Sequence, residues 1–524
     1  MKTPRGRLGC CRSTIQHWEI MSAPLTSVGP DPATPGVPPA GCPRRVGRPA
    51  RRAASVTAGA LIGAAILVPG ARAADQFESR KDIAPPSVRV TTPARNTAPG
   101  LVFVAPKGGE EQRGPMIYDN AGNLVFFRPV PENATVLDFR AQTYQGKPVL
   151  TWWQGKAKRG YGFGKGVIYD QSYRQIGRVR AGNGKRMDFH EFNLTPQGTA
   201  LVLAYKIVPQ DLRSVEGGKR KDLAMENVVQ EIDVATGKVL LQVNLNKLIA
   251  PRASYDVVPD RVKLPYDYIH ANSVNLDDDG NLLVSARATN AVYKINRKSG
   301  RLMWTLGGKQ SDFKLGKGAR FRFQHDAQRQ ADGTITLFDN NADVPVPGLQ
   351  SRGVQLRVNE SKRRATLVRQ FKNPKPQLAA SQGNLQALPN DNVFIGWGGS
   401  QTNQTEFGRG GAIRFEARFT NKVVDTYRAY RFAWSGRPAE PPRAVARRSG
   451  AGTAVHASWN GATAVASFRV LGGASETGLQ ARATEARSGF ETTLRYATQD
   501  AVLVVEALDA QGTVLGRSNP FALG

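Results

Sequence analysis

The segment KINRKSGRLMWTL, Lys294–Leu306, consists of a short β-type run, a polar turn and a second β-type run. The same pattern recurs at Ile117–Phe127, Ile168–Val179, Glu231–Val243, Gln355–Val368 and Ile413–Tyr427. These hairpins start roughly fifty to sixty residues apart, and each interval contains another β pair. Four antiparallel strands in each of six repeats predict an all-β chain folded as a six-bladed β-propeller. A pair of β-sandwiches would not explain such even spacing.

The composition changes after about Phe432. A Pro-containing linker over 433–445 precedes short alternating β runs, which predict a small immunoglobulin- or fibronectin-like β-sandwich over 446–524. We therefore expect a leader over 1–73, a linker over 74–97 and a propeller, which carries the chemistry, over 98–432. The sandwich shows no catalytic constellation, and we expect an accessory domain that contacts the cell surface.

The N-terminus has the features of an export signal. Arginines from Arg44 to Arg52 form a basic region, Ala53–Gly70 is an apolar run, and Ala71–Ala73 is a small-residue cleavage site. We expect a secreted or extracytoplasmic protein, or a membrane-anchored one if the leader is not cleaved. All 3 cysteines lie in this leader, so the mature chain would contain neither a disulfide nor a thiolate nucleophile.

The charge of the chain limits its partners. The leader holds 10 Lys and Arg against 2 Asp and Glu, so its removal would leave +22 of the formal +30. A basic surface without blocks of like charge favours acidic small substrates or anionic surfaces. No basic helix or recognition motif indicates nucleic acid. The run DDDGN, Asp277–Asn281, lacks the full spacing of a calcium loop and is predicted to be a turn, so we predict no metal and no other cofactor.

Histidine is scarce, with 5 in 524 residues, and three of them occupy equivalent positions. Each of these three precedes the turn glycine of its hairpin by eight or ten residues, which places it at the start of the hairpin's first strand. They are His190, His270 and His325. The first strand of each propeller blade lines the central channel. Three imidazoles are therefore predicted to converge at one end of that channel.

Two further side chains are expected at the same place. The strand after a turn runs back toward the histidine, so Arg287 should lie beside His270. Asn272 points to the same face of its strand as His270. An arginine, several histidines and an amide suit an oxyanion with several equatorial oxygens, such as sulfate or phosphate. Arg287 is also expected to lower the pKa of His325 and to keep it unprotonated at neutral pH.

At these residues the chain resembles a known family. The segments HANSVNLDDDGNLLVSAR, YKINRKSGRLMWTLGGK and FQHDAQ are similar to the arylsulfotransferase (arylsulfate sulfotransferase) family. The resemblance covers roughly Pro99 to Tyr430 and is most specific between His270 and Asp326. It implies a six-bladed propeller that transfers a sulfuryl group from an aryl sulfate donor to a phenolic acceptor, without the nucleotide donor PAPS. It also implies a ping-pong route through a sulfohistidine.

The family's functional residues carry over to individual positions. His325 would match the histidine that becomes sulfated, as the nucleophile. The residues that hold the sulfuryl oxygens would match His190, His270, Arg287 and, for substrate binding, Asn272. A further threonine of the family has two candidates here, Thr402 and Thr405. Sulfuryl transfer passes through a loose, charge-bearing transition state, which such a site would position and stabilise.

Two other functions stay open at the level of the sequence. In the first, the three histidines bind a metal such as Zn, Cu or Fe, although the nearby cation of Arg287 disfavours this. In the second, the propeller is a secreted binding or adhesion module without catalysis, and its basic charge suits an anionic polymer. The sequence leaves the oligomeric state open.

Overall fold

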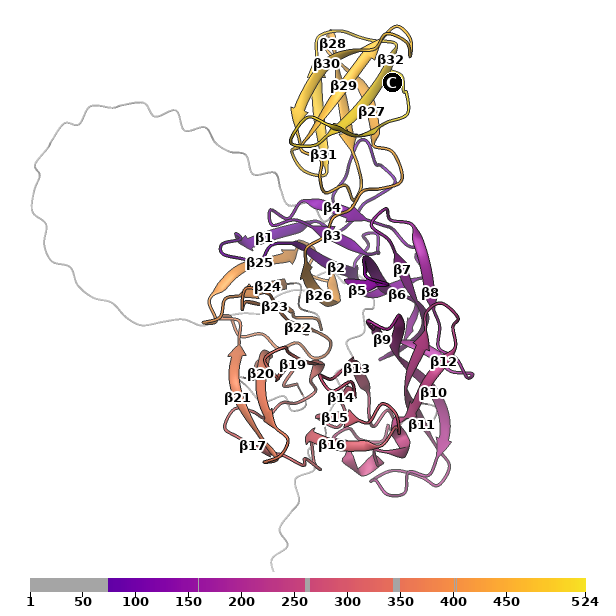
Figure 1. Ribbon diagram of the computed structural model, residues 1–524, viewed down its shortest axis with the longest axis vertical. Helices are drawn as coiled ribbons and strands as arrows, with labels where there is room; N and C mark the ends of the chain where they lie inside the picture. The colour runs from indigo at the N-terminus through magenta and orange to yellow at the C-terminus, as the bar shows by residue number, and fades with distance from the viewer. Residues whose placement is uncertain (1–73, 159, 260–263, 343–348, 400, 402) are drawn as a thin grey trace, which may run out of the picture. The chain divides into compact units, whose positions relative to one another are not determined.

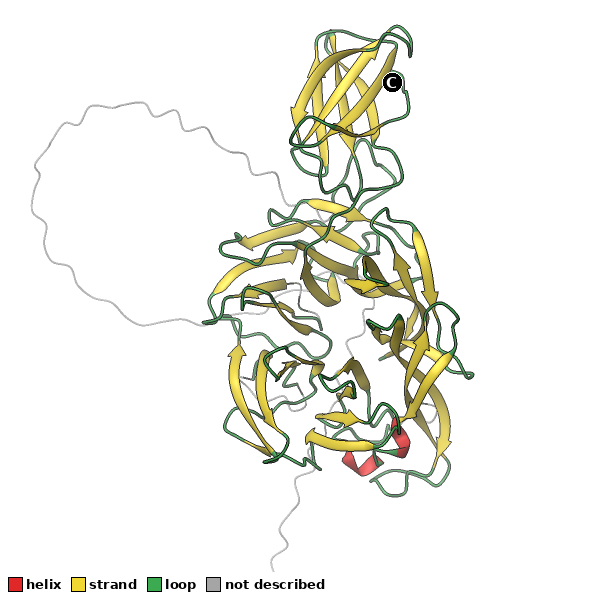
Figure 2. Cartoon of the chain, viewed as in Figure 1, coloured by secondary structure: helices red, strands yellow, loops and turns green. Residues whose placement is uncertain are grey.

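The computed structural model describes residues 74–524 except 159, 260–263, 343–348, 400 and 402. Its regular structure is almost entirely β, with two three-residue 3-10 helices, η1 (Leu245–Lys247) and η2 (Pro251–Ala253) (Figure 2). The prediction of an all-β chain is confirmed. The predicted leader over 1–73 lies outside the described residues. Within the described part of the chain, no helix has the length and apolar character that a membrane crossing requires.

The strands between β2 and β26 pair antiparallel in successive sets of four. The first set is β26 (Asp425–Phe432), β2 (Leu101–Lys107), β3 (Met116–Tyr118) and β4 (Leu124–Phe127). The second is β5 (Thr135–Tyr144), β6 (Lys147–Lys158), β7 (Tyr161–Tyr169) and β8 (Gln175–Val179). The third is β9 (Arg186–Leu194), β10 (Thr199–Gln210), β11 (Asp222–Asp233) and β12 (Val239–Asn244).

Three more sets follow along the chain. The fourth is β13 (Ala271–Leu276), β14 (Leu282–Ala286), β15 (Ala291–Ile295) and β16 (Leu302–Gly307). The fifth is β18 (His325–Arg329), β19 (Thr334–Asp339), β20 (Arg352–Asn359) and β21 (Arg364–Phe371), with β17 (Lys314–Leu315) added beside β21. The sixth is β22 (Asn384–Ala387), β23 (Val393–Gly396), β24 (Asn403–Phe407) and β25 (Ile413–Phe419).

These sets are arranged around a centre, toward which β5, β9, β13, β22 and β26 lie (Figure 1). Adjacent sets pack through apolar side chains: Tyr205 of β10 shares one core with Val274 of β13 and Val284 of β14. The pairing of Gly164 with Met187 joins the second and third sets in one continuous sheet. The fold is therefore propeller-like, and the number of separate blades stays a prediction.

The ends of this region interlock. Strand β26 pairs with β2, with Leu101 opposite Phe432, and β1 (Val88–Thr92) pairs with β25. The predicted hairpin at Ile413–Tyr427 is therefore wrong, because its two strands belong to different sheets. The segment predicted as a linker over 74–97 contributes β1 to the sixth set. Strands β25 and β26 do not pair with each other, because β25 pairs with β1 and β26 pairs with β2, which are both distant in the sequence.

The remaining strands form two further sheets. One contains β27 (Arg443–Ser449), β28 (Gly452–Ser458) and β31 (Glu491–Tyr496). The other contains β30 (Gln480–Ala486), β29 (Ser467–Gly473), β32 (Val502–Leu508) and β33 (Val514–Arg517). Both sheets contribute to one apolar core, with Val455 and Leu494 from the first and Phe468 and Val505 from the second. This arrangement is a β-sandwich, as predicted, and the exact domain boundaries stay predictions.

A buried cation connects the central strands of five sets. Arg428 of β26 is fully buried, and its Nη1 lies 3.1 Å from Asp138 Oδ1 on β5 and 3.3 Å from Glu191 Oε2 on β9. Its Nη2 donates to the Asn272 carbonyl oxygen on β13 at 2.9 Å and lies 3.8 Å from Asp326 Oδ1 on β18. One guanidinium thus contacts the inner strands of four other sets.

Replacing Arg428 with Met should destabilise the protein, because the two buried carboxylates Glu191 and Asp138 would then share Arg140 as their remaining paired cation among the described residues. Breaking a buried ion pair from one side costs about 3–5 kcal/mol. Chemical denaturation followed by tryptophan fluorescence measures the loss. The matched control is Arg409→Met, since Arg409 is exposed and lies 3.8 Å from exposed Asp391. Equal denaturation midpoints for the two variants would contradict this role of Arg428.

Candidate active site

The inner strands pair irregularly where they approach the centre. The register of the ladder shifts between Leu137 and Arg140 on β5, between Met187 and Phe192 on β9, and between Ala271 and Ser273 on β13. Further shifts occur between His325 and Gln328 on β18 and between Thr426 and Ala429 on β26. The residues displaced by these bulges include Asp138, His190, Asn272, Asp326 and Arg428. Bulges redirect side chains and are frequent beside active sites.

Backbone strain gathers at the same place. His270, Phe323 and Gln382 have φ values of 50°, 51° and 65°. Asp138 and Asp326, which belong to two of the bulges, have φ values of 55° and 56°. Residues other than glycine rarely adopt this left-handed region, and such residues cluster at functional sites. The strain supports a functional role for the centre of the fold.

His190 and His270 lie edge to face, with ring centroids 4.9 Å apart. His190 is 2% exposed, whereas the side chain of His270 is 15% exposed. Burial, with a smaller contribution from His270, holds the pKa of His190 well below its usual value. His190 is therefore a neutral imidazole near pH 7, and His270 is the more accessible of the two rings.

Each of these histidines is oriented by its own aspartate. His270 Nδ1 lies 2.7 Å from Asp267 Oδ2, and His190 Nδ1 contacts Asp188 Oδ1. Burial alone would raise the pKa of Asp267, but His270 and neighbouring donors lower it, so Asp267 is ionised. Burial raises the pKa of Asp188 to about 7, although the backbone N–H groups of His190 and Gly162 donate to the carboxylate and act to lower it. With the Nδ1 atoms engaged, Nε2 is the ring nitrogen of both histidines that remains for chemistry.

The environment of His325 defines its tautomer. Its Nδ1 lies 2.7 Å from Asn340 Oδ1 and 3.1 Å from the Phe323 carbonyl oxygen, and both partners are acceptors. The Asn340 amide is oriented by donating to the carbonyl oxygens of Ala379 and Gln382. Nδ1 therefore carries the proton. The backbone N–H of Gln382 donates to Nε2 at 3.1 Å, so Nε2 presents a lone pair.

His325 is also kept neutral. It is 1% exposed, and burial lowers its pKa well below the usual value. The hydrogen bond with Asn340 opposes this, and the nearby Arg287, His190 and His270 add to the lowering. The pKa of His325 is thus lowered, as expected, but the main cause is burial and Arg287 contributes less.

Arg287 and Asn272 complete the cluster. The guanidinium of Arg287 lies 3.9 Å from the centroid of the Phe323 ring, and its backbone N–H donates to the His270 carbonyl oxygen at 3.0 Å. Asn272 is fully buried, and its Nδ2 donates to the Gln324 carbonyl oxygen at 2.8 Å. Asn272 Oδ1 is buried and has no hydrogen-bond partner among the described residues. Arg287 supplies charge, and Asn272 ties β13 to the residue that precedes His325.

The structure brings all five predicted residues to one place, with two differences in detail. His190 lies in the bulge within β9, whereas the sequence placed it at the start of a strand. Thr405 on β24 is one candidate for the family's threonine. Its hydroxyl accepts a hydrogen bond from Trp397 and donates one to Glu416. Thr402 lies outside the described residues. The group from the sixth set that contacts His325 is the backbone of Gln382.

Sequence reasoning missed the supporting residues Asp188, Asp267 and Gln382 and gave Asn340 no role. A signal for the aspartates exists, because each lies two or three positions before its histidine. Gln382 is 57 positions from His325 and contributes only a backbone amide, which no sequence motif identifies.

The three histidines do not form a compact ligand set. Within the described ranges, the only group of three side chains with ligand atoms inside 4.8 Å of one another is Asp277, Asp278 and Asp279. Asp277 is already paired with Arg329, Nε to Oδ1 at 2.6 Å, and with Lys294. This geometry does not support the alternative of a tri-histidine metal site.

Comparisons with known proteins agree with the resemblance. A family model described as arylsulfotransferase (ASST) matches residues 140–420, which is more than half of the chain. A comparison with curated proteins gives no match.

Among solved structures, a protein of unknown function from Bacteroides caccae is 15% identical, with a TM-score of 0.39 over 64% of this chain and 100% of that one. A periplasmic gluconolactonase from Pseudomonas aeruginosa is also 15% identical, with a TM-score of 0.35 over 81% and 96%. A streptogramin B lyase is 10% identical, with a TM-score of 0.34 over 64% and 89%.

Replacing Asn340 with Asp should raise the pKa of His325, because a carboxylate would accept the Nδ1 hydrogen bond and stabilise the imidazolium. We expect the midpoint of the His325 titration, followed by NMR of labelled histidine, to rise by at least about one pH unit. Asn390→Asp, the same change at an exposed turn of the sixth set, should leave this titration unchanged. An unshifted His325 in Asn340→Asp would exclude the Asn340 contact.

Proposed function

Since the chain belongs to the arylsulfotransferase family, we propose that it transfers a sulfuryl group from an aryl sulfate to a phenolic acceptor, with His325 as the nucleophile. The observation that carries this proposal is the state of His325: neutral, protonated on Nδ1 and with a lone pair on Nε2. A neutral imidazole is a competent nucleophile, and covalent capture divides one difficult transfer into two steps.

In the first step, Nε2 of His325 attacks the sulfur, the S–Nε2 bond forms, and the bond from sulfur to the aryl oxygen breaks. The hydrogen bond from the Gln382 N–H must leave Nε2 before attack. That N–H is then beside the incoming sulfuryl group and can donate to one of its oxygens. The aryloxide leaves with the electron pair of the broken bond.

Charge on the sulfuryl oxygens is stabilised by Arg287. The loose transition state of such transfers spreads negative charge over the equatorial and leaving oxygens. Donors and cations fixed around it act strongly in a site that is shielded from water. Two contacts position the guanidinium of Arg287: it stacks on the Phe323 ring, and its Nη1 lies 3.5 Å from Asp256 Oδ2.

Proton transfer is assigned to His270. Its Nδ1 is held by the ionised Asp267 and its ring is partly accessible, which leaves Nε2 to exchange a proton with the substrate. In this scheme His270 protonates the leaving aryloxide and then removes the proton of the acceptor phenol. The phenol oxygen attacks the sulfur, and the S–Nε2 bond breaks to restore His325. No nucleotide donor and no metal take part.

We further propose that this reaction occurs outside the cytoplasm, as the basic and apolar leader indicates. Mass measurement of the protein recovered from the culture medium, the periplasm, the membrane fraction and the cytoplasm tests this. A mature chain that begins near Ala74 supports export with cleavage, and an intact chain in the cytoplasm contradicts it.

His325→Ala should lower the rate at which p-nitrophenol is released from p-nitrophenyl sulfate in the presence of phenol by at least about a thousandfold. With donor alone, the wild-type protein should gain the mass of one SO3 group, and the variant should gain none. The control is His456→Ala, which removes the histidine of the β-sandwich. A folded wild-type protein that releases no p-nitrophenol with any acceptor would favour the non-catalytic binding module instead.

Arg287→Ala should lower the turnover number by about a hundred- to a thousandfold, because removal of one preorganised charge stabiliser has effects of this size. Arg301→Ala, at an exposed turn of the same set, should match the wild type. Steady-state rates with p-nitrophenyl sulfate and phenol measure both. Wild-type turnover in Arg287→Ala would remove this residue from the mechanism.

A further inference from the structure

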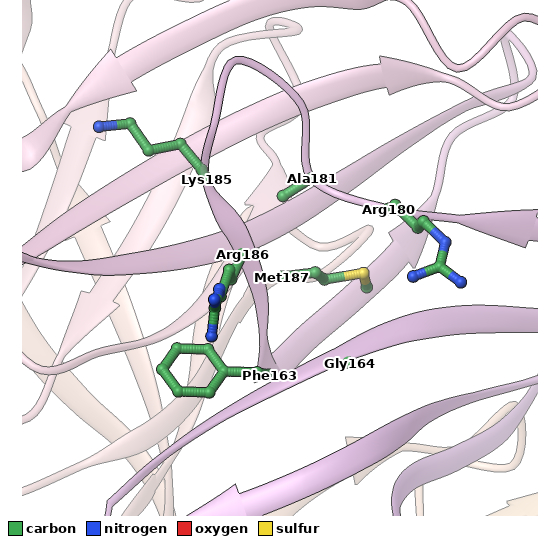
Figure 3. A pocket seen from close by; sticks show the side chains of 7 residues that line it. All are labelled: Phe163, Gly164, Arg180, Ala181, Lys185, Arg186 and Met187. Carbon is green, nitrogen blue, oxygen red and sulfur yellow. The ribbon is translucent and has the colours of Figure 1, made fainter.

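A second group of cations lies outside the histidine cluster, where β7 and β9 meet. A cavity of about 290 Å³ is lined by Phe163, Gly164, Arg180, Lys185, Arg186 and Met187 (Figure 3). We call this cavity the basic pocket. Its volume is just below the roughly 300–1,000 Å³ of sites that enclose a whole small molecule. It therefore fits one substituent of a ligand better than an entire ligand.

The basic pocket has an excess of positive charge. Lys185 is paired with Glu226, but Arg180 and Arg186 are exposed and form no ion pair within the part of the chain that the structure describes. Lys165 lies nearby on β7, and burial together with Arg178 and Arg180 lowers its pKa. Cations gathered in this way, without matching carboxylates, attract an anionic group.

The basic pocket also offers an aromatic surface. The guanidinium of Arg186 lies 4.8 Å from the centroid of the half-buried Phe163 ring, and Figure 3 shows the two side chains together. Lys158 reaches the same ring at 6.0 Å. Arginine beside an aromatic face suits a planar ligand that carries negative charge.

The basic pocket is connected to the proposed active site through β9. Met187 lines the pocket and pairs with Gly164, and the next residue is Asp188, which holds His190. The backbone N–H of Gly162, two positions before Gly164, donates to Asp188 Oδ2 at 2.7 Å. Met187 and His190 are three residues apart on β9, so at about 3.3 Å per residue they are at most about 10 Å apart, and the bulge between Met187 and Phe192 shortens this span. An aromatic molecule with two rings spans such a distance.

We propose that the basic pocket binds a second acidic group of an elongated aromatic substrate whose other end reacts at the histidine cluster. This inference rests on the proposed function. The substrate class is an aryl sulfate or a phenol that carries a carboxylate or sulfate at its far end. Arg180 and Arg186 bind the acidic group, and Phe163 contacts the adjoining ring.

The test compares ligands that differ only in the remote acid. As acceptors, 4′-hydroxybiphenyl-4-carboxylate and 4-hydroxybiphenyl are assayed with p-nitrophenyl sulfate as donor. As donors, the sulfate esters of the same two compounds are assayed with phenol. We expect the acidic member of the acceptor pair or of the donor pair to have a KM about tenfold lower in the wild type. The pair that shows this preference identifies which substrate uses the pocket.

The double variant Arg180→Ala/Arg186→Ala should lose the preference and keep wild-type rates with the neutral compounds. The control Arg174→Ala removes an exposed arginine from the turn between β7 and β8 and should keep the preference. Equal KM values for acidic and neutral compounds in the wild type would overturn the proposal. So would an equal loss in Arg174→Ala, which would show that general surface charge is responsible.

A binding measurement separates this proposal from the proposed function. Calorimetry with 4′-hydroxybiphenyl-4-carboxylate on His325→Ala should show binding that disappears when Arg180 and Arg186 are also replaced by Ala. Such binding, together with a folded wild-type protein that transfers no sulfuryl group, would support the pocket and reject the function. Transfer to phenol without any such binding would support the function and reject the pocket.

Discussion

The buried guanidinium of Arg428 is the contact on which the centre of the fold depends. It contacts Asp138, Glu191, Asp326 and the backbone of Asn272, so one side chain of β26 reaches the inner strands of four other sets. A buried cation is tolerated only where several groups compensate its lost hydration. The bulges on these strands provide the compensation, because they turn carboxylates and a carbonyl oxygen toward the centre. The same bulges place His190 and Asn272 at the candidate active site.

The three histidines of the site share one feature: a neighbouring side chain contacts Nδ1 and orients the imidazole ring. Asp188, Asp267 and Asn340 each contact the Nδ1 atom of one histidine and leave Nε2 for the substrate. The partners differ in charge, and the difference separates the proposed roles. A neutral amide behind His325 suits a nucleophile that must stay unprotonated, whereas an ionised carboxylate behind His270 suits a proton carrier. Burial, more than the neighbouring arginine, keeps His325 neutral.

The junction between the second and third sets has a structural and a chemical consequence. The pairing of Gly164 with Met187 makes one continuous sheet of the two sets. Gly164 and Met187 also line the basic pocket, and the nearby N–H of Gly162 donates to Asp188. In the proposed scheme this one sheet carries both the reactive end and the binding end, so the spacing of its residues would set the length of the substrate.

The sequence by itself determined the β architecture, because alternating runs and polar turns are local and repeat along the chain. It also determined the group of His190, His270, His325 and Arg287, since position relative to a hairpin turn predicts which end of a blade a residue occupies. Only the tertiary structure decided how the ends interlock and what holds the site together. Arg428 is 290 positions from Asp138, and Gln382 is 57 positions from His325. Contacts at such separations arise when the sheets close around a common centre, so no local pattern encodes them.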